Sequence, residues 1–143
     1  MAAKTNPGRF LFKTEPSSYS YARLAKEGRA VWDGVTNPVA LRHLAEVRAG
    51  DQVLIYHTGG EKSVVGLARA ASDPYPDPGD RNGKVLVVDL LPVKALARPV
   101  TLGAIKVDPR FRDFALVRQG RLSVTAVPED LWQAILRMGG ERG

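Results

Sequence analysis

One short stretch of the sequence combines residue types that could hold a planar, polar ring. Trp32, Asp33 and Gly34 follow one another between a strand-like segment at residues 29–31 and a predicted helix that opens at Asn37. A tryptophan offers a flat face for stacking, a carboxylate accepts hydrogen bonds from an amino group, and a glycine lets a ligand approach the backbone. These groups, with the Asn37 amide, suit a nucleobase. The alternative is structural: Trp32 in the core, Asp33 capping a turn and Gly34 supplying a positive φ.

Three residues elsewhere could add polar groups to the same site. Lys13 ends a predicted strand, His57 ends another, and Ser123 lies in a third. An amine, an imidazole and a hydroxyl can each donate a hydrogen bond to a ligand. Of the two histidines, His57 is the better candidate to contact the ligand, because His43 lies within a helical pattern. The structural alternatives are a surface amine, a satisfied histidine and a strand hydroxyl.

Asp33, His57 and Ser123 also supply the residue types of a hydrolase triad. The Gly-x-Ser-x-Gly motif is absent, however, so this alternative rests on residue types alone. The chain has no cysteine, which excludes disulfides, thiolate zinc sites and thiol nucleophiles. Two histidines and scattered acids form no ligand cluster for a metal. We therefore expect a binding protein without a cofactor, not an enzyme.

The charge of the chain points to a nucleic-acid partner. The net charge is +6, and residues 94–121 contain seven basic residues against two acids. Such a basic segment is the electrostatic signature of a phosphate-backbone binder. A solvated basic face, or a surface for an acidic protein, is the alternative. The side chains expected to contact the backbone are Arg110, Arg112, Arg118 and Arg121.

Hydrophobic periodicity and capping signals predict an α+β domain. We expect strands at residues 9–13, 51–57, 63–71, 84–96, 115–118 and 122–127, and residues 29–31 are strand-like. We expect a first helix from an N-cap at Ser18 or Ser20 to Gly28, and further helices at about 37–50 and 129–138, with short helical turns after Thr101 and Asp108. Residues 73–83 are rich in proline and glycine and should form a surface loop. About six short strands flanked by helices indicate a curled sheet or small barrel.

The length indicates one domain. A chain of 143 residues can bury roughly two-thirds of its unfolded surface without metals or disulfides. We expect a disordered lead-in at residues 1–8 and a single domain at 9–143. The N-terminal residues carry no apolar run, so the sequence predicts neither a signal peptide nor a membrane span. We expect a monomeric cytoplasmic protein.

Four segments resemble, in the same order, the motifs of the EVE domain, the thymocyte nuclear protein family of the PUA-like group. They are residues 13–20 (Lys-Thr-Glu-Pro-Ser-Ser-Tyr-Ser), 32–37 (Trp-Asp-Gly-Val-Thr-Asn), 56–58 (Tyr-His-Thr) and 116–124 (Leu-Val-Arg-Gln-Gly-Arg-Leu-Ser-Val). The resemblance implies a small curled β-barrel flanked by helices. It also implies recognition of a modified base, with modified cytosine in DNA as the favoured ligand and RNA as the alternative. A base in a duplex would then have to be flipped out to reach the site.

The sequence departs from the family pattern at two places. Phe10 stands where the family often has a tryptophan, and the familiar Arg-Asn-Tyr-Gln-Ala-Arg segment is Thr-Asn-Pro-Val-Ala-Leu at residues 36–41. The arginine, tyrosine and glutamine of that segment are replaced by Thr36, Pro38 and Val39, and its last arginine by Leu41. The resemblance therefore predicts the fold more firmly than the ligand.

Overall fold

The structure is a computed structural model that describes residues 8–141. The expected lead-in at residues 1–8 lies outside this part except for Gly8. The N–H of Gly8 donates to Asp51 Oδ1 at 2.8 Å, and its carbonyl accepts from the N–H of Gln52. Gly8 is therefore already attached to the start of the third strand.

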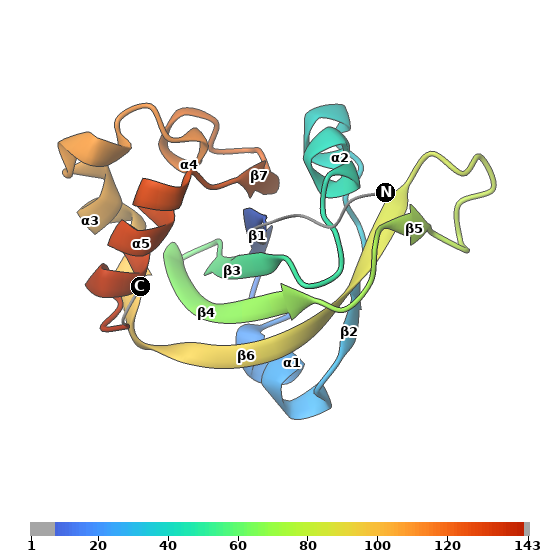
Figure 1. The fold of residues 1–143 in the computed structure, drawn as a ribbon, viewed down its shortest axis with the longest axis horizontal. Helices are drawn as coiled ribbons and strands as arrows, with labels where there is room; N and C mark the ends of the chain where they lie inside the picture. The colour runs from blue at the N-terminus through green and yellow to red at the C-terminus, as the bar shows by residue number, and fades with distance from the viewer. Residues whose placement is uncertain (1–7, 142–143) are drawn as a thin grey trace.

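The elements follow the α+β order that the sequence predicts (Figure 1). In chain order they are β1 (Arg9–Thr14), α1 (Tyr21–Glu27), β2 (Ala30–Trp32), α2 (Pro38–Ala45), β3 (Gln52–His57), β4 (Ser63–Ala70), β5 (Tyr75–Pro76), β6 (Leu86–Thr101), α3 (Leu102–Lys106), η1 (Pro109–Phe111), α4 (Ala115–Arg118), β7 (Val124–Ala126) and α5 (Glu129–Met138). None of the described helices is long and apolar enough to cross a membrane.

The strands form one curled mixed sheet in the order β2-β6-β4-β3-β1-β7, and the short β5 pairs with β6. β1 and β3 run parallel, whereas the other neighbours run antiparallel. The pairing of β4 with β6 shifts register twice, and such irregularities bend strands. Pro92 lies in β6 opposite Ala68, beside one of these shifts, where a residue without an N–H is tolerated. The long β6 consequently sweeps across the whole molecule (Figure 1).

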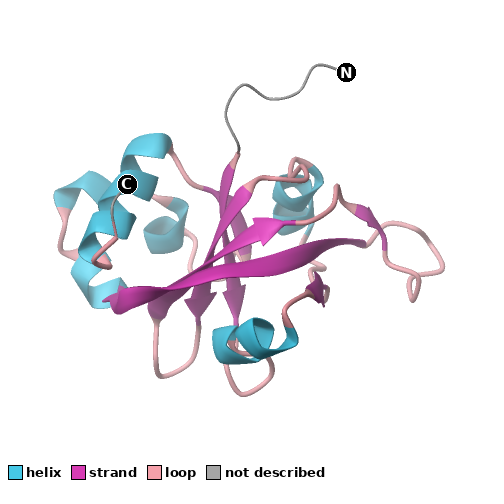
Figure 2. Ribbon diagram, turned by 60° about the horizontal axis from the view of Figure 1, so that its bottom comes forward, coloured by secondary structure: helices cyan, strands magenta, loops and turns pink. Residues whose placement is uncertain are grey.

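Two hydrophobic cores lie on opposite faces of the sheet. The alternation of side chains along a strand sends Phe12 and Ile55 to one face and Leu11 and Leu54 to the other. The first core contains Phe12, Leu24, Trp32, Leu44 and Ile55; the second contains Leu11, Leu54, Phe111, Trp132 and Ile135. Helices α1 and α2 cover the first core, and α3, α4 and α5 gather over the second (Figures 1 and 2).

Local capping signals account for where the helices begin. Ser20 caps α1 by accepting from the N–H of Arg23, and Thr101 caps α3 through the N–H of Ala104. The predicted cap before Pro109 is also present, because Asp108 accepts from Arg110 N. The closing helix at Glu129–Met138 is confirmed, and its Trp132 is buried as expected.

The predicted strand at residues 115–118 is wrong. These residues form the helical turn α4, closed by a hydrogen bond from Gln119 N to Ala115 O at 2.7 Å. A four-residue apolar segment is too short to distinguish the two periods, and burying Leu116 in the second core decides the outcome. The strand expected at 122–127 shortens to β7, because only Val124–Ala126 pair with β1.

Candidate functional site

A cavity of about 360 Å³ opens where β1, β2 and the segment before β7 meet. Five of the residues predicted to bind a ligand line it: Lys13, Trp32, Asp33, Gly34 and Ser123. The remaining lining residues are Thr14, Ser18, Tyr19, Val31 and Val35. Segments far apart in the sequence therefore come together at one cavity.

A tight turn after β1 forms one wall of the cavity. The carbonyl of Glu15 accepts from the N–H groups of Ser18 and Tyr19, both at 2.9 Å. Thr14 Oγ1 donates to the Tyr19 carbonyl at 2.8 Å, so the chain folds back beside the end of β1. Pro16, which lacks an N–H, prevents β1 from continuing. The turn places the Tyr19 ring against the cavity.

Trp32 is both a core residue and part of the cavity wall. Only 7% of its surface is exposed. Its ring lies 5.8 Å from that of Phe12, and the Tyr19 ring meets it edge-on at 6.0 Å. Such tilted and edge-to-face arrangements are favourable for aromatic pairs. The neighbouring rings therefore fix the orientation of Trp32 before any ligand arrives.

Asp33 and Gly34 form the exposed rim. The Asp33 carboxylate makes no hydrogen bond or ion pair with any residue in the described part of the chain. Gly34 has φ +79°, and an added Cβ would meet no atom within 4 Å. The glycine is thus required by the backbone conformation and not by crowding. Asp33 consequently keeps a free acceptor beside the buried tryptophan.

Lys13, near the end of β1, and Ser123, just before β7, complete the polar lining. Lys13 Nζ donates to the Gly120 carbonyl at 2.9 Å and lies 5.8 Å from the centre of the Tyr56 ring. Partial burial lowers the pKa of Lys13. The backbone of Ser123 accepts from Lys13 N, and its hydroxyl has no partner among residues 8–141. The cavity therefore offers a positive donor and a free hydroxyl in addition to the Asp33 acceptor.

Tyr19 is a site residue that the residue-type analysis missed. Its hydroxyl donates to Glu27 Oε1 at 2.6 Å, and the Arg23 guanidinium lies 5.0 Å from the centre of its ring. Burial, together with the hydrogen bond to Glu27, raises the pKa of Tyr19 to about 12. Thr14 and Ser18 were missed as well. All three lie in the segment at residues 13–20 that carries the family resemblance, which was the available signal.

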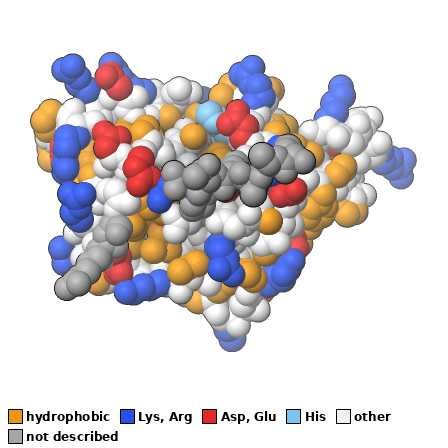
Figure 3. Space-filling model, in the orientation of Figure 1, with side chains coloured by type: hydrophobic (Ala, Val, Ile, Leu, Met, Phe, Trp, Pro, Cys, Tyr) orange, Lys and Arg blue, Asp and Glu red, His pale blue; other side chains and the backbone are white. Residues whose placement is uncertain are grey.

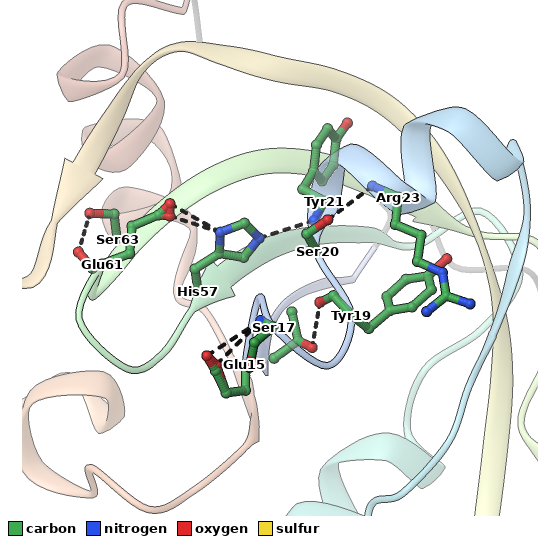
Figure 4. Close-up of polar contacts among 10 residues, drawn as sticks. Glu15, Ser17, Tyr19, Ser20, Tyr21, Arg23, His57, Glu61 and Ser63 are labelled. Carbon is green, nitrogen blue, oxygen red and sulfur yellow. Dashed lines mark hydrogen bonds and ion pairs between the residues drawn. The ribbon is translucent and has the colours of Figure 1, made fainter.

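His57 is not among the residues that line the cavity, and its ring lies between Tyr21 and Glu61 (Figure 4). Its Nε2 accepts from the N–H of Tyr21 at 3.0 Å, so Nδ1 carries the proton and donates to Glu61 at 2.9 Å. The imidazole thus fastens the end of β3 to the start of α1. No hydrogen bond joins His57 to Asp33 or Ser123 in the described chain, so the structure does not assemble the hydrolase triad considered above.

Asn37 also lies outside the cavity, in a separate hollow beside Arg121. Its Oδ1 accepts from the N–H groups of Val39 and Ala40 at 2.9 and 3.1 Å. The predicted N-cap before Pro38 is therefore confirmed.

The predicted backbone-binding arginines differ in their pairing. Arg110 binds Asp108 at 2.6 Å, while Arg118 and Arg112 lie 3.6 and 4.0 Å from Asp113. In contrast, Arg121 makes no ion pair with any residue between 8 and 141. On the face in Figure 3, Lys and Arg side chains follow the outline of the molecule with acidic side chains among them. The described residues contain no group of three metal-ligating side chains.

Comparison with known proteins identifies first the fold class of this arrangement and then its family. A curled mixed sheet flanked by helices is the PUA-like fold, and the sequence profile of the EVE domain matches residues 9–138. The chain therefore belongs to the EVE domain family.

Solved structures agree. The NMR structure of Rpa0253 from Rhodopseudomonas palustris is 39% identical, covers 93% of both chains and has a TM-score of 0.89. Atu2648 from Agrobacterium tumefaciens is 31% identical, covers 94% of both chains and also scores 0.89. Human THYN1, solved in complex with DNA containing 5-methylcytosine, is 20% identical over 95% of this chain and 99% of its own, with a TM-score of 0.85. No curated protein matches the sequence.

Proposed function

We propose that this protein is a non-catalytic nucleic-acid-binding domain that recognises a modified base, with modified cytosine in DNA as the favoured ligand. One observation carries the proposal: a base-sized cavity joins an aromatic wall at Trp32 to the unpaired carboxylate of Asp33. Its volume of about 360 Å³ lies at the lower end of small-ligand sites. The complex of human THYN1 with DNA containing 5-methylcytosine supports the choice of ligand class.

The polar groups of the cavity match the edge of a cytosine. The exocyclic amino group of cytosine is a donor, which the Asp33 carboxylate can accept. The base also carries acceptor atoms, to which Lys13 Nζ and the Ser123 hydroxyl can donate. The exposed part of Trp32 and the ring of Tyr19 supply the apolar surface that a 5-methyl group needs.

Access to the cavity requires an unstacked base. The target must be single-stranded or flipped out of a duplex, which costs a few kcal/mol. Contact between a base and an aromatic side chain returns about 1–3 kcal/mol, and phosphate contacts supply the rest. Arg121 is the strongest candidate for such a contact, because Arg110, Arg112 and Arg118 already face carboxylates. RNA offers the same base chemistry and is the alternative ligand.

A binding role fits the contacts better than hydrolysis. A Ser-His-Asp triad needs the histidine hydrogen-bonded to both partners. In this chain both ring nitrogens of His57 are occupied by Tyr21 N and Glu61. We therefore assign His57 a structural role and do not extend the proposal to a reaction.

Competitive binding tests the proposal through the contact at Asp33. Matched single-stranded oligonucleotides carry cytosine, 5-methylcytosine or thymine at one central position, in DNA and in RNA. Thymine keeps the 5-methyl group but presents a carbonyl where 5-methylcytosine presents an amino group. The protein should prefer 5-methylcytosine, and Asp33→Asn should reduce the preference over thymine by about 1–3 kcal/mol, because the amide can donate to the thymine carbonyl.

Asp130→Asn is the matched control. It makes the same chemical change at another exposed aspartate, in the first turn of α5 and away from the cavity. The control should keep the wild-type preference. An Asp33→Asn variant with an unchanged preference would remove Asp33 from the recognition site, and a wild-type protein that binds all three bases equally would overturn the proposed function.

A further inference from the structure

A second hollow lies next to the base cavity. It has a volume of about 320 Å³ and is lined by Asn37, Val39, Gln119, Gly120, Arg121 and Leu122. None of these residues is acidic, whereas Asp33 lines the cavity itself. The two depressions therefore differ in charge, and the hollow presents one arginine and two amides beside apolar surface.

Two segments of chain run from the cavity into the hollow. On one side Val35 lines the cavity and Asn37 lines the hollow two residues later. On the other side Ser123 lines the cavity, and the adjacent Leu122 lines the hollow. Lys13 lines the cavity and donates to the carbonyl of Gly120 in the hollow. A ligand that fills the cavity and extends beyond it on this side enters the hollow.

Capping of α2 fixes the chemistry that Asn37 presents. Its Oδ1 accepts from two backbone N–H groups, of Val39 and Ala40, so the acceptor end of the amide is committed to the helix. The Nδ2 group makes no hydrogen bond within residues 8–141 and keeps two N–H donors. Asn37 thus offers a ligand donors and no free acceptor atom.

The two other polar residues are equally uncommitted. The guanidinium of Arg121 is exposed and has no carboxylate partner in the described chain, unlike Arg110, Arg112 and Arg118. The side chain of Gln119 makes no hydrogen bond with residues 8–141. Val39 and Leu122 supply apolar contacts between these donors. The set is suited to an anionic group attached to an apolar ring.

We propose that this hollow binds the phosphate and sugar of the nucleotide next to the base in the cavity. Arg121 pairs with the phosphate, the amides of Asn37 and Gln119 donate to it, and Val39 and Leu122 contact the sugar. The inference rests on the proposed function in taking nucleic acid as the ligand and a base as the occupant of the cavity, but not in requiring a modified base. It sets the direction in which the strand leaves the cavity and distinguishes Arg121 from the arginines that have carboxylate partners.

Neutralising one phosphate at a time tests this assignment. The probe is a single-stranded DNA 9-mer with a central 5-methylcytosine, in which each linkage in turn is replaced by an uncharged methylphosphonate. We expect one linkage adjacent to the central base to weaken binding by about tenfold, the effect of losing a charge-assisted hydrogen bond. In Arg121→Gln the same methylphosphonate replacement should not weaken binding further. The slope of log affinity against log salt concentration should become less negative by about 0.7.

Arg118→Gln is the matched control, because this arginine is also exposed but lies 3.6 Å from Asp113. It should retain the sensitivity to the single linkage. If that sensitivity persists in Arg121→Gln, or if no linkage next to the central base matters more than the others, the proposal is overturned.

Asn37 can be tested without losing the helix cap. Both Asn37→Asp and Asn37→Ser keep a side-chain oxygen that caps α2, so the melting temperature should change little. The aspartate places a negative charge in the hollow and removes both donors, and it should weaken binding by more than tenfold. The serine removes the amide without adding charge and should cost less. Equal affinity of Asn37→Asp and the wild type would exclude a phosphate from this hollow.

The control probe separates this inference from the proposed function. The linkage scan is repeated with an unmodified cytosine at the centre. If the modified base is not preferred but both probes show the coupling between Arg121 and one linkage, the proposed function fails and the phosphate assignment stands. If the base preference is present and the coupling is absent in both probes, only the phosphate assignment fails.

Discussion

The two tryptophans occupy the two cores, and their surroundings differ more than their burial does. Trp32 is 7% exposed in the first core, and Trp132 is 1% exposed in the second. Beside Trp132 lies an ion pair: Arg9 is 5.7 Å from the centre of the ring, and its Nη1 binds Glu129 at 2.6 Å. Around Trp32 the Asp33 carboxylate and the Ser123 hydroxyl have no partner in the described chain. A binding site is therefore indicated by unpaired polar groups beside an aromatic ring and not by exposure of the ring.

The largest expected effect is the loss of the second-core tryptophan. Trp132→Ala removes a fully buried ring and should lower the free energy of unfolding by about 3–5 kcal/mol. Denaturant unfolding measures this loss. Binding assays on the variant, at a temperature where circular dichroism shows it to be folded, should give the wild-type base preference. A changed base preference in folded Trp132→Ala would place part of the recognition site in the second core.

Trp32 should affect stability and recognition together. Trp32→Ala should lower the free energy of unfolding by about 3 kcal/mol, since the ring packs against Phe12. In addition it should reduce the preference for the modified base by about 1–3 kcal/mol. Trp32→Phe keeps an aromatic ring and should recover most of the stability. If both variants bind 5-methylcytosine as well as the wild type does, Trp32 is only a core residue.

Salt dependence should show that phosphates contribute to binding. If the protein contacts about five phosphates of a single strand, the log–log slope of affinity against salt is about −3.5, or about a hundredfold loss between 50 and 200 mM. Arg110→Ala should change the slope less than Arg121→Ala, because Asp108 already neutralises Arg110. A slope near zero for the wild type would remove nucleic acid as the ligand.

The sequence predicted the parts of the fold that local chemistry controls. The caps at Ser20 and Asn37 are set by side chains close to the N–H groups that they accept from. The segment at residues 115–118 was misjudged because its conformation depends on burial of Leu116 in the second core. Non-local contacts are not encoded in a short window, so short apolar segments stay ambiguous until the packing is known.

The candidate site also contains residues that local sequence identified and residues that only tertiary contacts reveal. Trp32, Asp33 and Gly34 were found because they are adjacent in sequence. Tyr19 was not, since helix α1 separates it from Trp32 and only the turn after β1 brings the two rings together. His57 was placed at the ligand on residue type, whereas its partners come from α1 and from the turn after β3. Residue types identify candidates, and the tertiary contacts decide which candidates remain available to a ligand.

The smallest expected effect is the titration of Tyr19 at the edge of the first-core cavity. Burial and the hydrogen bond to Glu27 raise its pKa from 10.0 to about 12. A raised pKa of the Tyr19 phenol means that the folded state favours the protonated, neutral hydroxyl over the tyrosinate. The associated stabilisation is therefore complete below pH 10 and is lost as the pH rises through 12.

Absorbance of tyrosinate measures this shift. The difference between the titrations of the wild type and Tyr19→Phe isolates one of four tyrosines, and its midpoint should lie near pH 12. The Tyr19 hydrogen bond is also the main cause that lowers the pKa of Glu27. The Glu27 pKa, followed by NMR, should consequently rise in Tyr19→Phe. A Tyr19 midpoint near pH 10 with circular dichroism unchanged would mean that the hydroxyl is neither buried nor held by Glu27 in solution. The Tyr19 ring would then not be fixed against Trp32 by its hydrogen bond to Glu27. The first core would in that case be less rigid at the cavity edge than the second core is around Trp132.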